Sequence, residues 1–361
     1  MNESKNFMSV PAGMGDPIIS YDVANILTGM FCFMVLVFSV PAVVLNIINI
    51  VIFVNTKIDS ITVCFISLSL SDLVAMLLLT KTAMVSIMRA FEVSWGKNLR
   101  TYLFLFTFGI GLSVDTSSAT TTYIALQRGL CVALPFLTRH LFNRNRSVIV
   151  CVSLFLFILA CSTPRATSFS LKNIPDPADN TSLLLIVKFF ETWGPFDSFY
   201  TIFVKTVLVC IEFCVMIVCA SLISYGMQSS MKLKLNSSTQ AQPTVGGHGN
   251  TTEDGKSNGE DQSQKKKEAK ESLVMKQSLI VVLIHVIFTT PRMLASLYVV
   301  FEPRYRVGAQ YQNLYFVSFS SISVTDSINA FANFFVYVRF NSKFRNYFMA
   351  NIYGRIFNIK S

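Results

Sequence analysis

The chain has 361 residues, of which 52% are hydrophobic and 14% are charged. In soluble domains about a quarter of the residues are charged, so this composition excludes an ordinary cytosolic, disordered or collagen-like protein. It favours a chain that crosses a membrane several times. The net charge of +10 is therefore interpreted as a guide to membrane orientation, and no nucleic-acid partner is expected.

Seven apolar runs are long enough to cross a bilayer, whose hydrocarbon core needs about 20 residues per helix. The sequence predicts an all-α membrane protein: an extracellular N-terminal tail, residues 1–26, followed by a seven-transmembrane helix bundle, residues 27–338. The predicted spans, in chain order, are 27–55, 61–87, 101–131, 147–169, 198–228, 274–300 and 312–338.

The distribution of basic residues predicts which side of the membrane each connection faces. If the N-terminus is outside, the inner connections carry 16 Lys and Arg residues and the outer ones carry 7. Because basic residues favour cytoplasmic loops, we expect a plasma-membrane protein with an extracellular N-terminus and a cytoplasmic C-terminus. The sequons at Asn2 and Asn180 then lie outside and are candidate glycosylation sites of a glycoprotein.

Two segments outside the predicted spans differ in composition from the spans. Residues 235–271, rich in Gly, Ser, Gln and Asn, are predicted to form a disordered third intracellular loop. Residues 339–361 alternate aromatic and basic side chains, which predicts a short cytoplasmic amphipathic helix on membrane lipids and a tail.

Polar side chains inside membrane spans cost free energy and mark candidate functional sites. One set is expected to converge on a buried cluster, either as a structural network between helices or as a site for a small cation such as Na⁺ or a proton. The members of this candidate sodium site are Asn46, Asp72, Ser117, Asn329 and Asn333.

A second set of polar residues in the spans is charged. Asp115, Lys205, Arg292 and Asp326 are expected to form either internal salt bridges or a pocket for a zwitterionic or peptide-like ligand. Glu212 has no assigned role, and His285 is interpreted as an ordinary interior residue.

These residues, taken in order, resemble the motifs of rhodopsin-like (class A) G protein-coupled receptors. The resemblance covers the whole chain, and it is the complete series of motifs in seven spans that makes it specific. The matching positions are Asn46, Asp72 in Leu-Ser-Leu-Ser-Asp-Leu, Ser117, Arg128, Pro135, Pro291 and the segment Asn-Ala-Phe-Ala-Asn-Phe-Phe-Val-Tyr that ends at Tyr337.

The resemblance implies a receptor that binds an extracellular peptide or chemosensory small molecule and activates a heterotrimeric G protein. It places Arg128, Pro135 and Tyr337 in G protein coupling. It assigns the conformational switch to Pro291, Thr289 and Asn333. Ile110 stands where aminergic receptors carry their amine-binding Asp, so Ile110 joins the ligand-binding candidates and a monoamine ligand is disfavoured.

The chain also departs from the family pattern. Gln127 replaces the acidic neighbour of Arg128 and Gly129 replaces the Tyr after it, so raised basal activity is expected. Phe334 replaces the seventh-helix Pro, Thr289 replaces a Trp, and the cysteines of the outer disulfide are absent. These differences suggest a divergent branch, such as invertebrate chemosensory or neuropeptide receptors.

Three alternative classes of protein can be compared with this sequence. A small transporter or channel is disfavoured because no inverted repeat or ring of charges is evident. An enzyme is not expected, because the three His residues form no His-Glu-x-x-His motif and no Gly-x-Ser-x-Gly occurs. No cofactor beyond a structural Na⁺ is expected. A receptor-like protein that no longer signals remains an alternative.

Overall fold

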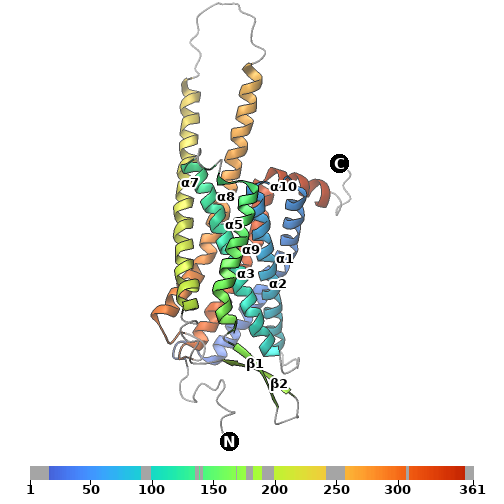
Figure 1. The fold of residues 1–361 in the computed structure, drawn as a ribbon, viewed down its shortest axis with the longest axis vertical. Helices are drawn as coiled ribbons and strands as arrows, with labels where there is room; N and C mark the ends of the chain where they lie inside the picture. Colours follow the sequence, from blue (N-terminus) through green and yellow to red (C-terminus); the bar gives the residue numbers. More distant parts are fainter. Residues whose placement is uncertain are drawn as a thin grey trace, which may run out of the picture.

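The computed structural model describes residues 16–90, 99–134, 138, 141–167, 169–175, 182–188, 199–240, 257–305 and 309–353. Within that part, seven long helical segments run side by side as one bundle (Figure 1). They are α1 (Tyr21–Asn55), α2 (Ser60–Ala90), α3 (Leu99–Ala133), α5 (Arg144–Thr167), the π-helix η2 (Tyr200–Leu208) continuing as α7 (Val209–Gln240), α8 (Ser257–Phe301) and α9 (Gln312–Phe340).

Shorter elements mark the two ends of the bundle. Strands β1 (Phe169–Pro175) and β2 (Ser182–Lys188) form an antiparallel hairpin, and α10 (Ser342–Tyr347) continues into the π-helix η3 (Phe348–Tyr353). Figure 1 shows the hairpin and α10 at opposite ends, which are called here the hairpin end and the α10 end.

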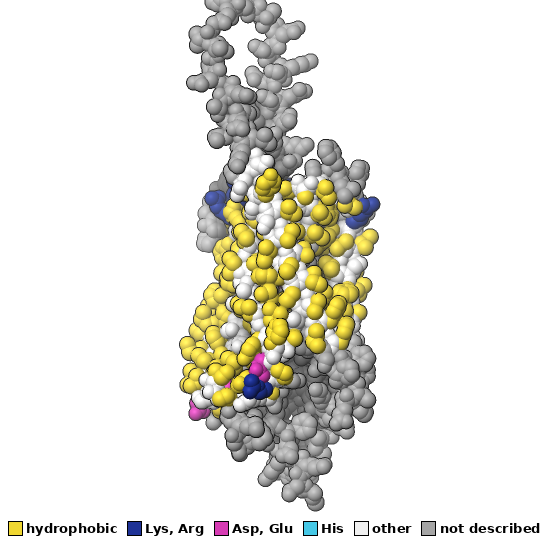
Figure 2. Space-filling view, turned by 90° about the vertical axis from the view of Figure 1, so that its left-hand side faces the viewer, with side chains coloured by type: hydrophobic (Ala, Val, Ile, Leu, Met, Phe, Trp, Pro, Cys, Tyr) yellow, Lys and Arg dark blue, Asp and Glu magenta, His cyan; other side chains and the backbone are white. Residues whose placement is uncertain are grey.

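The outer surface of the bundle is apolar. Five helical segments in the described part are long and apolar enough to cross a membrane: α1, α2, α5, the η2–α7 segment and α8. In Figure 2 hydrophobic side chains cover the middle of the visible face, and charged side chains lie at its margins. Exposed apolar residues such as Phe33, Ile149 and Ile287 therefore suit contact with lipid.

An aromatic cluster closes the α10 end. Phe53 of α1, Phe65 of α2 and Phe344 of α10 surround Tyr337 of α9, with ring centroids 4.9–5.8 Å from the Tyr337 ring. Asn341 caps α10, because its side chain accepts a hydrogen bond from the backbone N–H of Phe344. The start of α10 is thus fixed against α1, α2 and α9.

The hairpin end is tied together by polar contacts near the start of α1. The Asp16 carboxylate accepts a hydrogen bond from the backbone N–H of Leu314, at 3.1 Å, in the first turn of α9. Asn313 donates its side-chain N–H to the Ile19 carbonyl at 3.0 Å. These bonds link the chain ahead of α1 to α9.

The predicted helical bundle is confirmed, with differences at the ends of its elements. Helix α1 begins at Tyr21, inside the predicted tail, because Ser20 caps it by accepting from the N–H of Val23. The disordered loop predicted at 235–271 is wrong on both flanks, since α7 continues to Gln240 and α8 begins at Ser257. The Lys-, Glu- and Gln-rich sequence before residue 271 favours helix, whereas 241–256 lie outside the described residues.

The hairpin is the element that the sequence analysis did not predict. Phe169 pairs with Lys188 and Pro175 with Ser182, so a short sheet follows α5 directly. All eight cysteines are free thiols.

Candidate functional site

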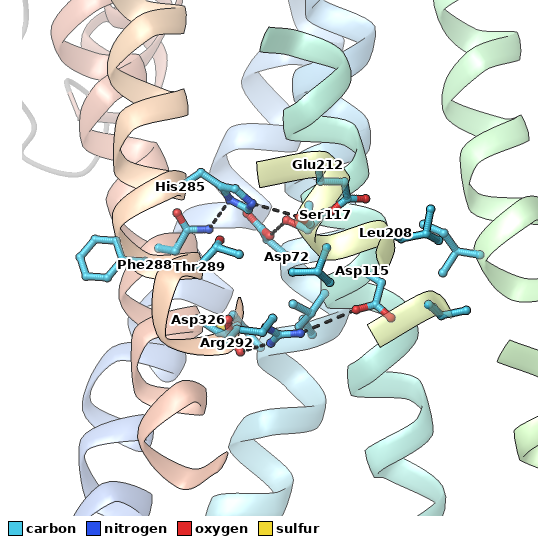
Figure 3. Close-up of a pocket in the computed structure, with 18 residues that line it drawn as sticks. Asp72, Asp115, Ser117, Leu208, Glu212, His285, Phe288, Thr289, Arg292 and Asp326 are labelled. Atoms are coloured by element: carbon cyan, nitrogen blue, oxygen red, sulfur yellow. Dashed lines mark hydrogen bonds and ion pairs between the residues drawn. The ribbon is translucent and has the colours of Figure 1, made fainter. Parts of the chain in front are cut away.

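A narrow cavity in the bundle interior is lined by several buried polar residues. It is lined from α2, α3, α5, the η2–α7 segment, α8 and α9, and its volume is about 30 Å³. That space accommodates a few water molecules or a small ion. The charged and ionisable side chains on its wall are Asp72, Asp115, Glu212, His285, Arg292 and Asp326 (Figure 3).

An ionic layer lies on the hairpin side of the cavity and joins all four charged residues singled out from the sequence. Lys205 Nζ lies 2.5 Å from Asp115 Oδ2, and Arg292 Nη1 lies 3.7 Å from Asp115 Oδ1. Arg292 also forms an ion pair with Asp326. Two acids and two bases neutralise one another, which offsets the cost of removing charges from water.

Local backbone features place Lys205 in this layer. Lys205 belongs to η2, whose π-helical turns rotate side chains relative to an α-helix and often occur at functional sites. Gly111 of α3 lies opposite, and a Cβ there would stand 3.4 Å from Lys205 Nζ. Glycine therefore leaves space beside the ammonium group.

Ile110 does not join the ionic layer and does not line this cavity. It packs instead against an apolar cluster that includes Ala75, Met76 and Val324. The neighbouring position on α3 thus contributes to helix packing, and the structure does not support Ile110 as part of the same pocket as Asp115.

A second layer centres on Asp72, which is almost fully buried. Ser117 donates a hydrogen bond of 2.6 Å to Asp72 Oδ1, and Asn333 donates one of 3.0 Å to Oδ2. Three of the five residues predicted to converge are therefore in contact, and they link α2, α3 and α9.

The other two residues of that predicted set have different partners. Asn46 donates its side-chain N–H to the carbonyl oxygens of Ala42, at 2.9 Å, and Ala330, at 3.5 Å, and so ties α1 to α9. Asn329 contacts His285, with 3.2 Å between Asn329 Nδ2 and His285 Nδ1. Asn329 thus lines the same cavity as Asp72 and Ser117 but bonds to His285, whereas Asn46 bonds to backbone carbonyls outside this group.

A third polar group was not predicted from the sequence. Ser118 donates to Glu212 Oε2 at 2.7 Å, and the same Ser118 oxygen lies 3.2 Å from His285 Nε2. With Asn329 this gives a continuous chain across α7, α3, α8 and α9. The available signal was Glu212 itself, a carboxylate inside an apolar run, together with paired serines on α3.

The α10 end of α3 carries Arg128 and Gln127, and their side chains have separate surroundings. Gln127 Nε2 donates to Ser60 Oγ at 2.5 Å, and Ser60 Oγ lies 2.6 Å from Ser147 Oγ. Gln127 therefore joins α3 to α2 and α5. Arg128 Nε is buried and has no hydrogen-bond partner within the described part of the chain.

The remaining site residues of the sequence analysis are distributed over α8 and α9. Thr289 is buried and lines the cavity, and Pro291 lies inside α8. Tyr337 is completely buried, and its hydroxyl finds no partner among the residues described. Pro135, Asn2 and Asn180 lie outside the described residues.

The model of one protein family matches this chain: the 7 transmembrane receptor (rhodopsin family), over residues 45–337. The chain belongs to the rhodopsin family of seven-transmembrane receptors. No curated protein matches it. The matched range begins just before Asn46 and ends at Tyr337, so it contains all three polar layers. The protein is therefore a multi-pass membrane receptor of a generally non-enzymatic, signalling family, with an extracellular ligand and a G protein partner implied by membership.

Proposed function

We propose that this receptor binds a zwitterionic extracellular ligand, a peptide or a chemosensory small molecule, at the ionic layer. Binding is transmitted to a heterotrimeric G protein at the α10 end of the bundle. The hairpin end and the N-terminus are extracellular, and the C-terminus is cytoplasmic in the plasma membrane. The observation that carries the proposal is the partly buried, mutually neutralised set of four charges, three of which line the cavity.

The charge balance of the layer selects the ligand class. A net cation or anion would leave an unpaired charge in a poorly hydrated site, which costs free energy. A zwitterion keeps the sum at zero, because its ammonium group takes the place of Lys205 on Asp115 and its carboxylate pairs with the released lysine. Lys205 is the most exposed of the four side chains, at 24%, and is thus the first that a ligand reaches.

Transmission requires that the ligand favours one of two conformations by its differential affinity. Arg292 lies one residue after Pro291, and proline removes a backbone hydrogen bond that would stiffen α8. A change of partners at Arg292 is therefore applied next to the weakest point of that helix. The α10 end of α8 moves away from the bundle, and Arg128 and Tyr337 form the surface that receives the G protein.

The unpaired polar atoms at that end support this assignment. Arg128 Nε and the Tyr337 hydroxyl lack partners within the described residues, and buried polar groups normally find one. The bound G protein or the rearranged bundle supplies those partners. Gln127 is uncharged and bonds to Ser60, so it does not restrain Arg128 as an acidic neighbour would, and basal signalling is raised.

Asp72 provides a site for Na⁺ in the resting conformation. Its carboxylate and the hydroxyl oxygen of Ser117 are hard oxygen donors, and Asn333 would contribute its amide oxygen after the amide turns. No Lys or Arg lies within ion-pair distance of Asp72 in the part of the chain that is described, so a bound cation would neutralise it.

A ligand screen tests the proposal. The full-length receptor is expressed with a promiscuous G protein reporter and exposed to short peptides and their N-acetylated and C-amidated forms. Activation by the zwitterionic form, lost with Arg292→Gln and retained with the lipid-facing control Phe33→Leu, is the expected result. Equal activation by the free peptide and by its N-acetylated and C-amidated forms would contradict the proposed ligand class. Ion flux in liposomes containing only the receptor would instead support the transporter or channel alternative.

A further inference from the structure

Four side chains, Glu212, Ser118, His285 and Asn329, form a chain of hydrogen bonds in which the direction of donation is defined. Ser118 Oγ is the donor to Glu212 Oε2, and a hydroxyl carries one hydrogen. His285 Nε2 must therefore donate to Ser118 Oγ, which makes Nδ1 the acceptor of the Asn329 amide N–H. This direction corresponds to a neutral imidazole with its hydrogen on Nε2, and it allows Glu212 to be an ionised carboxylate.

One atom is left unsatisfied by this direction. Asn329 Oδ1 is buried and has no hydrogen-bond partner in the described structure. Because an amide oxygen and nitrogen are interchangeable in shape, turning the Asn329 amide brings Oδ1 to His285 Nδ1. The oxygen is then satisfied only if Nδ1 carries a hydrogen.

If every hydrogen bond in this chain reverses its direction of donation, His285 Nδ1 carries a hydrogen. This reversal needs a single added proton. A proton from hydronium in the cavity adds to His285 Nδ1, and the Nε2 proton passes to Ser118. The hydroxyl proton of Ser118 passes to Glu212. Each intermediate atom gives up one proton and takes up one, so the imidazole stays neutral, Glu212 becomes a carboxylic acid and the net gain is one proton.

We propose that Glu212 is a proton-binding site of this receptor, linked through Ser118 and His285 to the orientation of the Asn329 amide. The proposal rests on the hydrogen-bond geometry and needs neither the ligand nor the G protein of the proposed function. Both directions satisfy Ser118 and His285. They differ at Asn329, where Oδ1 lacks a partner in the first direction and the amide N–H lacks one in the second.

The charges that surround this chain favour proton uptake at Glu212. Glu212 makes no ion pair in the described part of the chain. The groups that share its cavity or lie beside it are Asp72 on α2, Asp115 on α3, Lys205 on η2, Arg292 on α8 and Asp326 on α9. The two cations are already paired with Asp115 and Asp326, so they leave the Glu212 carboxylate uncompensated, whereas the apolar interior favours the neutral acid.

Proton binding is coupled to the packing of α8 on α9, because the bond between His285 and Asn329 joins these two helices. Only a conformation that binds the proton more tightly is favoured by acid, and the coupling is reciprocal. Separation of α8 from α9 would leave His285 and Asn329 to hydrate independently. The proton occupancy of Glu212 therefore differs between the two conformations.

Infrared difference spectroscopy between about pH 5 and about pH 9 tests the proposal on the purified full-length receptor in lipid nanodiscs without ligand. A protonated carboxyl has a carbonyl stretching band that an ionised carboxylate lacks. We expect such a band to titrate in the wild type, to be lost in Glu212→Gln and to persist in Asp72→Asn, the matched change at the other unpaired buried carboxylate.

Ser118→Ala provides a second, milder variant that keeps the carboxyl group. It removes the hydrogen bond to the ionised form, so the midpoint of the Glu212 band should move to higher pH. A band that is absent from the wild type, that disappears in Asp72→Asn instead, or whose midpoint is the same in Ser118→Ala, would each overturn the proposal. If Glu212→Gln does not fold, the Ser118→Ala shift decides alone.

Discussion

At the scale of single residues, the interior separates its polar groups into layers that share few members. Asp72 has two amide or hydroxyl donors and no basic partner among the described residues, whereas Asp115 contacts two cations. A carboxylate surrounded by neutral donors is suited to a mobile cation, and one held by fixed cations is suited to exchange with a charged ligand. The two acids therefore serve different parts of the proposed function.

The sodium site gives the first prediction at this scale. In Asp72→Asn, agonist affinity should no longer depend on Na⁺, because the neutral amide cannot bind the ion. In the wild type, Na⁺ should weaken agonist binding, since the ion binds the resting conformation. Equilibrium binding of an active ligand from the screen, measured in Na⁺ and in a bulky organic cation, checks this. An unchanged Na⁺ effect in the variant would contradict the site.

Gln127, the neighbour of Arg128, gives a second prediction. Gln127→Glu introduces an acid beside an arginine whose Nε has no partner within the described chain, so the resting conformation should gain about 1 kcal/mol. Basal nucleotide exchange on the G protein should fall by roughly five-fold. Gln127→Met, which has similar volume and no charge, is the control. A rise in basal exchange with Gln127→Glu would count against restraint of Arg128 by an acidic neighbour.

At the scale of elements, α10 is held in place mainly by the packing of one side chain, Phe344, and less by its own backbone hydrogen bonds. Its six residues are too few for a stable isolated helix. Phe344 is 1% exposed and contacts Phe53, Phe334 and Tyr337. The end of α9 and the membrane-surface helix are thus joined through one aromatic cluster.

Truncation of Phe344 measures how strongly α10 is held. Phe344→Ala should lower the free energy of unfolding by about 3–5 kcal/mol and lower the melting temperature of the purified receptor. Met349→Ala is the control, because Met349 is 47% exposed and its loss should change stability little. Equal melting temperatures for both variants would show that α10 is not anchored by this cluster.

The sequence predicted the helices well and their lateral contacts only in part. The apolar runs predicted all seven helical segments. The polar residues within them predicted that Asp72 lies close to Ser117 and Asn333. Spacing along one helix does not fix the rotation of its neighbours, so the partnership of Glu212 with Ser118 and His285 was not foreseen. The same limit explains why the contact between Asn329 and His285 was not foreseen. The hairpin was missed because β1 follows α5 almost without a break.

At the scale of the whole molecule, the three polar layers lie close together in the bundle interior. The ionic layer, the Glu212 chain and the Asp72 layer meet the same cavity, and each joins a different set of helices. Because the layers all include α3 and α9, a change of partners in one alters the packing available to the next.

We expect the receptor to pass this change of partners to a G protein through Arg128. The most direct test measures nucleotide exchange on a purified G protein by the full-length receptor, with a ligand from the screen, for the wild type and Arg128→Ala. We expect Arg128→Ala still to bind the ligand and to lose most of the stimulated nucleotide exchange. Full exchange by Arg128→Ala, at unchanged ligand affinity, would contradict it.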